Sequence, residues 1–309
     1  MVGAVERRIA LRQPLDLYST LSVVRRGAGD PTWLGAPSGR SSDGIVKGWN
    51  TPAGPVTAVL RPEPGTAALH ATAWGPGADW LLERLARVVA DEDDDAGFRI
   101  HHDVVRQLRR RFAHWRVPAT GLVIESLVPS IIEQRVTGKE AFGSYRALVR
   151  AYGDPAPGPL AERGLMVAPT ARRWASIPSW GWTTAGVDSG RAATVVQACA
   201  RAGRLEEVAD DPAAARRRLA ALPGVGRWTV AEVAHTALGD PDAVSFGDYH
   251  VAKNIGWALT GRPVEDAQLA ELLEPYTGHR YRVQRLIELG GLRRPRRGPR
   301  TSLPTHLPG

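Results

Sequence analysis

The chain has 309 residues, of which 43% are hydrophobic, and this is enough apolar material for a substantial folded core. Its formal net charge of +8 favours a polyanionic partner, although a positive balance of this size also occurs in proteins that bind none. The single cysteine, Cys199, excludes an intrachain disulfide, a four-cysteine iron–sulfur cluster and a cysteine-based zinc knuckle. No window of about twenty residues is uninterruptedly apolar, so we predict a cytoplasmic protein of the bacterial nucleoid with no membrane partner.

Residues 1–98 are predicted to form a β-rich N-terminal domain. Short alternating apolar runs at 57–62 (TAVLRP) and 67–75 (AALHATAWG) suit strands bounded by turns. Apolar residues at helical spacing in 77–90 (GADWLLERLARVVA) indicate one helix that packs on this sheet.

Residues 99–290 are predicted to be helical, because the apolar periodicity there is punctuated by proline and glycine. The chain is therefore predicted to have an α+β fold with a mostly α-helical second part. We expect Trp174, Trp180 and Trp257 in the core of the helical part. Residues 291–309 contain proline and arginine without apolar periodicity, and we expect a disordered basic tail.

The stretch ALPGVGRWTV, residues 221–230, predicts a tight turn between two helices, the second starting near Arg227. Gly224 and Gly226 lack a Cβ, so the backbone there can adopt positive φ and approach another molecule closely. The first N–H groups of the second helix, at the positive end of its dipole, are well matched to a phosphate oxygen. The alternative is an ordinary helical hairpin in which the glycines only cap and turn.

Twenty-two residues after Gly226 stands an aspartate, Asp248, in the stretch AVSFGDYHVAKNI. With the LPGVG turn, this makes residues 222–255 similar to the helix-hairpin-helix/GPD DNA glycosylase superfamily, and within it to the 3-methyladenine DNA glycosylase II branch. Residues 11–33 resemble the start of that family's N-terminal domain, and residues 125–153 resemble its long core helix pair. The resemblance implies a helix-hairpin-helix glycosylase core with an N-terminal β-rich (TBP-like) domain.

The resemblance gives Asp248 the catalytic role, in which a carboxylate stabilises an oxocarbenium-like sugar and orients or deprotonates water. From the residues alone, Gly-Asp before an apolar helical run is also good N-cap chemistry, and the two roles are compatible. Strand-cutting relatives carry a lysine nucleophile in the second hairpin helix, at the position that Trp228 occupies here. The chain is therefore expected to be monofunctional and to leave an abasic site.

The resemblance also implies a base pocket, for which we expect Trp228, Tyr249 and Trp182. Alkylated purines are electron-poor, which favours stacking on an indole and makes them good leaving groups. A tryptophan that packs the helix pair is the alternative reading of Trp228.

A flipped base leaves a gap in the duplex that the enzyme fills. In IIEQRVTG the family's intercalating residue follows the glutamine, so the candidates are Gln134 and Arg135. Arg135 departs from the apolar wedge of the relatives, and a solvated surface arginine is the competing reading.

The expected DNA phosphate-binding residues are Gly224, Val225, Gly226, Arg227 and Thr229. The resemblance implies that the hairpin carbonyls can hold a monovalent cation, and we expect no other cofactor and no metal site.

The expected function is excision of alkylated purines, of the 3-methyladenine and 7-methylguanine type, from damaged double-stranded DNA by a monomeric enzyme of base excision repair. Two alternatives stay open. One is a glycosylase for oxidised or deaminated bases, and the other is a noncatalytic helix-hairpin-helix DNA-binding protein.

Overall fold

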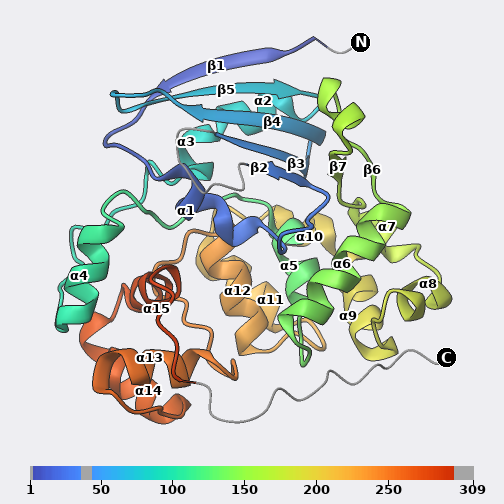
Figure 1. Cartoon of the computed structure of the whole chain (residues 1–309). Coiled ribbons are helices and arrows are strands. Elements are labelled where there is room, and N and C mark those ends of the chain that lie inside the picture. Colours follow the sequence, from blue (N-terminus) through green and yellow to red (C-terminus); the bar gives the residue numbers. More distant parts are fainter. Residues whose placement is uncertain (1–2, 36–43, 296–309) are drawn as a thin grey trace. The chain divides into compact units, whose positions relative to one another are not determined.

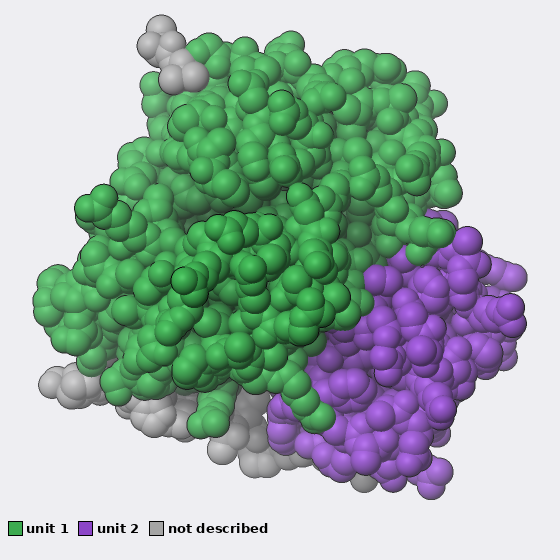
Figure 2. All heavy atoms as spheres, turned by 180° about the vertical axis from the view of Figure 1, so that it is seen from behind, with its two compact units in different colours: residues 1–94, 114–240 green, residues 95–113, 241–309 purple. Residues whose placement is uncertain are grey.

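The computed structural model describes residues 3–35 and 44–295, and the chain divides into two units. Unit 1 comprises residues 1–94 and 114–240, and unit 2 comprises residues 95–113 and 241–309 (Figure 2). The boundary predicted at residue 98 does not separate these units, because unit 1 holds both the five-stranded sheet and many helices. Most of the predicted tail, residues 296–309, lies outside the described residues.

Unit 1 contains a five-stranded antiparallel sheet with the strand order β1-β5-β4-β3-β2 (Figure 1). The strands predicted at 57–62 and 67–75 are present as β4 and β5, and β4 pairs antiparallel with both β3 and β5. The predicted helix over 77–90 is present as two short helices, of which α2 packs on β1, β4 and β5. These elements are β1 (Val5–Ala10), α1 (Leu17–Leu21), η1 (Ser22–Val24), β2 (Trp33–Gly35), β3 (Ile45–Thr51), β4 (Gly54–Pro62), β5 (Ala68–Trp74), α2 (Ala78–Glu83) and α3 (Leu85–Val88).

Helix α5 (Val123–Ile132) is the centre of the helical part of unit 1. All its residues except Glu125 are buried, and it packs against α6, α9, α10 and α12. The remaining elements are α6 (Gly138–Tyr152), β6 (Asp154–Pro155), η3 (Pro159–Arg163), β7 (Met166–Val167), α7 (Ala171–Ala175), α8 (Ser179–Thr184), α9 (Ser189–Cys199), α10 (Ala202–Glu206), α11 (Pro212–Ala220) and α12 (Arg227–Ala237). A helix buried on nearly all sides explains why residues 123–132 contain one charged side chain.

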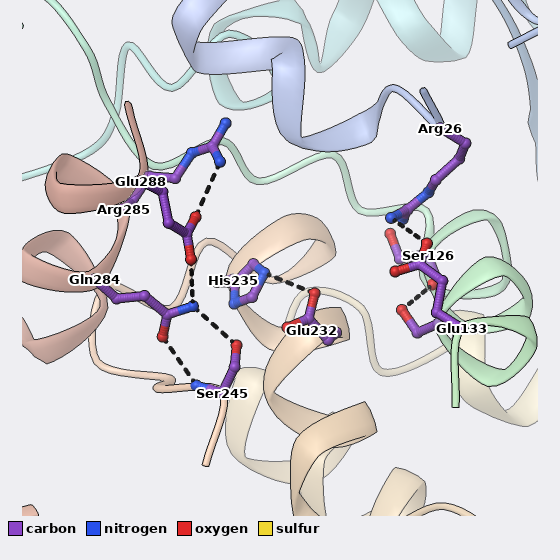
Figure 3. Close-up of polar contacts among 10 residues, drawn as sticks. Arg26, Ser126, Glu133, Glu232, His235, Ser245, Gln284, Arg285 and Glu288 are labelled. Atoms are coloured by element: carbon purple, nitrogen blue, oxygen red, sulfur yellow. Dashed lines mark hydrogen bonds and ion pairs between the residues drawn. The ribbon is translucent and has the colours of Figure 1, made fainter. Parts of the chain in front are cut away.

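Unit 2 is helical, and in it α15 packs against α4 and α13. Its elements are α4 (Asp103–Arg111), α13 (Val251–Thr260), α14 (Asp266–Leu273), η4 (Glu274–Tyr276) and α15 (Arg280–Leu289). The amide of Gln284 on α15 accepts from the backbone of Ser245 at 3.0 Å and donates to Glu288 at 2.9 Å (Figure 3). This buried network anchors the loop that leads to α13.

In the described part of the chain, no helix combines the length and apolar character that crossing a membrane requires.

Candidate active site

The hairpin between α11 and α12 belongs to unit 1 and has the turn that the two glycines predict, with one difference. Gly224 has φ +80°, and a Cβ there would lie 2.3 Å from Oγ1 of Thr194, so only glycine fits. Gly226 has φ −93°, in the extended region, and the prediction of positive φ at this second glycine is wrong. A Cβ at Gly226 would meet no atom within 4 Å, so the glycine leaves open space in front of the turn.

The N-terminus of α12 lies at this exposed turn. Gly226 is its N-cap and supplies no side-chain hydrogen bond, and Arg227 in the first turn is exposed. Val225 is 7% exposed, so its side chain is a core contact and only its backbone faces the turn. The exposed N-terminus of a helix with an open glycine before it is suited to an anion.

Gln134 and Thr229 hold the hairpin in place instead of facing outward. The Gln134 amide donates to the carbonyl of Gly224 at 3.0 Å and to the Thr229 hydroxyl at 2.9 Å. Thr229 is 1% exposed, so the expectation that its side chain supports a phosphate is not met. Insertion of Gln134 into DNA would break both of these hydrogen bonds, which argues against its predicted intercalating role.

Arg135 is the remaining candidate for intercalation, and it is exposed directly after Gln134. Its φ of +58° places a bulky side chain in the left-handed region that non-glycine residues seldom adopt. Such strained positions are often found at functional sites.

The exposure of the tryptophans differs in part from the prediction. Trp182 is 3% exposed and stacks on Trp174 with ring centroids 5.8 Å apart, so it is a core residue and has no face to offer a base. Trp174 is buried as predicted, whereas Trp180 and Trp257 are 67% and 37% exposed, and their assignment to the core is wrong. Trp228 is half-buried in the first turn of α12, and its indole N–H has no hydrogen-bond partner among the described residues.

Asp248 belongs to unit 2 and lies just before α13. Its Oδ1 accepts from the backbone N–H groups of His250 at 2.7 Å and Val251 at 3.0 Å, so it holds the start of α13, although the N-cap residue is His250 and not Asp248. The preceding Gly247 has φ +90° and donates its N–H to Asp266 at 2.8 Å, so the backbone on both sides of the carboxylate is held. Within the described residues, no hydrogen bond or ion pair involves Oδ2 of Asp248. The hydrogen bonds to Oδ1 therefore orient the carboxylate.

Tyr249 follows the carboxylate and is 64% exposed. The ammonium of Lys253 lies 3.9 Å from its ring centroid, and the His250 ring meets it edge-on at 4.9 Å. These contacts fix an exposed aromatic face next to Asp248.

A metal site of the usual kind brings together at least three histidine, cysteine, aspartate or glutamate side chains. Residues 3–35 and 44–295 contain no such cluster that could hold a metal ion.

The chain has the fold of the helix-hairpin-helix DNA glycosylases, with the β-rich N-terminal part that the sequence predicts. It is similar to the structure of 3-methyladenine DNA-glycosylase from Archaeoglobus fulgidus, with a TM-score of 0.72 and 16% identity over 91% of this chain and 97% of that one. It is also similar to the 8-oxoguanine glycosylase/lyase of Clostridium acetobutylicum, with a TM-score of 0.63 and 10% identity over 93% and 98% of the two chains. A third similar structure is MBOgg1 with a low-affinity DNA ligand, with a TM-score of 0.64 and 14% identity over 94% and 99%. No family model matches the sequence, and no curated protein matches it either.

Proposed function

We propose that this protein is a monofunctional DNA glycosylase that hydrolyses the N-glycosidic bond of alkylated purines in double-stranded DNA. The observation that carries the proposal is the orientation of the Asp248 carboxylate. Backbone N–H groups donate to its Oδ1, and no hydrogen bond or ion pair from a residue that the structure describes involves its Oδ2. The similarity in fold to a 3-methyladenine DNA-glycosylase supports the substrate class.

In the proposed reaction, the hairpin grips the backbone of the damaged strand. The N–H groups at Gly224 and Gly226 and the Arg227 side chain hold a phosphate, whereas the Val225 N–H donates to the carbonyl of Leu222 at 3.1 Å within the turn. The target base leaves the stack, and the Arg135 guanidinium occupies the gap.

The freed base then stacks on an aromatic ring, for which the candidates are the half-buried indole of Trp228 in unit 1 and the exposed ring of Tyr249 in unit 2. A base alkylated at a ring nitrogen carries positive charge, so it binds well to aromatic faces and departs without a strong general acid. Asp248 stabilises the oxocarbenium-like sugar and accepts the proton of the attacking water.

The proposed product is an abasic site in an intact strand. Helix α12 contains no lysine, and the Lys253 ammonium lies over the Tyr249 ring. A Schiff-base nucleophile of the kind used by strand-cutting enzymes is therefore not part of the mechanism.

The test is chromatographic identification of the bases released from dimethyl-sulfate-treated duplex DNA by the wild type and by Asp248→Asn. Asparagine keeps an oxygen that can cap α13, so this variant removes the charge and preserves the helix start. We expect release of methylated purines by the wild type and a fall of about 100-fold or more in the variant, with retained binding to an abasic analogue. Equal release by both proteins would contradict the proposal.

A second candidate function is excision of oxidised or deaminated bases, favoured by the similarity to an 8-oxoguanine glycosylase/lyase over 93% of this chain. The same assay on oxidised and deaminated duplexes separates the two substrate classes. Should the wild type release no base from any of the three substrates, a DNA-binding protein without catalysis is the better description.

A further inference from the structure

Unit 1 contains a hollow of about 320 Å³ that is separate from the hairpin. It lies along the first half of α5, whereas Gln134 and the hairpin lie beyond the other end of that helix. Its walls are mostly apolar and include Ile124, Val128, Pro129, Ala168, Pro169 and Trp174. A partly enclosed apolar hollow of this volume is typical of sites for small molecules.

The charged side chains that line this pocket are acidic, whereas the chain as a whole is basic. The protein has 40 basic residues, yet the residues that line the pocket include two glutamates, Glu125 and Glu206, and no arginine, lysine or histidine. A phosphate or carboxylate ligand would be repelled here, so the pocket is not a second grip for nucleic acid.

Hydrogen bonds from the backbone hold both carboxylates in place. Glu206 accepts from the N–H groups of Ile124 at 2.8 Å and Val123 at 3.2 Å, and Glu125 accepts from the N–H of Asn50 at 2.9 Å. The two carboxylates are rigid hydrogen-bond acceptors, because the N–H groups that donate to them lie at the start of α5 and near the end of β3.

Burial and mutual repulsion disfavour the charged form of both carboxylates, and no cation is among the groups that shift the pKa of Glu206. Burial raises the pKa of Glu206 to about 7, and the nearby charge of Glu125 raises it further. Burial likewise raises the pKa of Glu125, against the lowering effects of Lys47 and Arg26. A cation placed here would relieve the repulsion between the two groups and replace lost hydration.

We propose that this pocket binds a small organic amine, whose ammonium pairs with Glu125 and Glu206 and whose hydrocarbon part lies against the apolar walls. We expect an organic cation instead of a bare metal ion, because the walls are mostly apolar and suit a hydrocarbon part. The site is independent of base release, because neither glutamate belongs to the hairpin or to the loop of Asp248.

The first measurement is calorimetric titration of the full chain with phenethylamine and hexylamine. The matched probes are phenethyl alcohol and hexanoate, which keep the apolar body and replace the ammonium with a neutral or an anionic group. Saturable binding of the amines, about tenfold or more tighter than of the matched probes, supports the proposal. No saturable binding of either amine, or equal binding of the alcohol, overturns it.

Two glycine variants locate the site. A Cβ at Gly203, which lines the pocket from α10, meets no atom within 4 Å, so Gly203→Leu adds a bulky side chain at the pocket lining without a clash of its Cβ. Gly143 on α6 is equally open and does not line the pocket, so Gly143→Leu is the matched control. We expect Gly203→Leu to abolish amine binding and Gly143→Leu to retain it, with both folded by circular dichroism. Equal amine binding by both variants would place the amine elsewhere and overturn the proposal.

Discussion

Arg135 combines an exposed position with a backbone conformation that costs an arginine free energy. Its φ is +58°, and Ala90 is the other non-glycine residue with positive φ among those described, at 63°. The left-handed region costs a residue with a Cβ roughly 1–2 kcal/mol. The strain at Arg135 has no evident structural benefit, which fits a residue retained for contact with DNA.

The substitution Arg135→Gly should therefore separate stability from function. We expect the free energy of unfolding to rise by about 0.5–1 kcal/mol and the rate of base release from duplex DNA to fall. Ala90→Gly relieves the same strain but loses a buried methyl group, so its gain should be smaller and base release unchanged. Urea denaturation and single-turnover base release measure the two quantities. Unchanged release by Arg135→Gly would remove this residue from the proposed site.

At the scale of secondary-structure elements, the two glycines of the hairpin between α11 and α12 have different structural roles. Gly224 is required by its positive φ and by Thr194, whereas Gly226 has ordinary φ and open space. The sequence motif does not distinguish Gly224 from Gly226, so it predicted positive φ at both.

Alanine at each glycine tests this division. Gly224→Ala should lower the free energy of unfolding by about 2–3 kcal/mol, because both the backbone and the neighbouring Thr194 must shift. Gly226→Ala should change it by less than about 1 kcal/mol but weaken DNA binding, since the new methyl group stands where a phosphate approaches. Thermal unfolding and fluorescence anisotropy with a duplex measure these effects. Equal DNA affinity of Gly226→Ala and the wild type would argue against phosphate contact at this turn.

Helix α5 begins without a side-chain cap from its own N-cap residue, and the carboxylate of Glu206 on α10 accepts its first N–H groups instead. The pKa of Glu206 is raised from 4.5 to about 7, so the folded state favours the protonated form. This group therefore stabilises the fold most below about pH 4.5, and the stabilisation is lost as pH rises through 7.

We expect the wild type to lose stability between pH 5 and 8, on the order of 2–3 kcal/mol, relative to the pH dependence of Glu206→Gln. Glutamine does not titrate, so the variant should show a flatter profile across this interval. Urea denaturation at several pH values provides the comparison. Parallel profiles for the two proteins would show that Glu206 titrates normally.

At the scale of the whole molecule, the net charge of +8 and the predominance of arginine favour association with the DNA backbone. If the hairpin and its neighbours neutralise about four phosphates, DNA affinity should fall about 100-fold between about 50 and 200 mM salt. Fluorescence anisotropy across this range gives the slope. A slope near zero would contradict a phosphate grip, whichever base the protein excises.

The sequence alone determined the elements and motifs whose signals are local. Alternating apolar runs predicted the strands at 57–62 and 67–75, helical spacing predicted the second part, and the glycine turn with Asp248 predicted the fold superfamily. These signals are readable because strand and helix periodicities, turn glycines and helix caps depend on residues within a few positions of one another.

Only the tertiary structure decided what depends on neighbours distant in the chain. It placed Trp182 in the core and Trp180 in solvent, although they are two positions apart, because helix packing selects one face of α8. It assigned Gln134 to the hairpin and brought Glu206 to the start of α5 across about eighty residues of chain. Burial and long-range hydrogen bonds follow from which surfaces meet, and no local pattern in the sequence encodes that meeting.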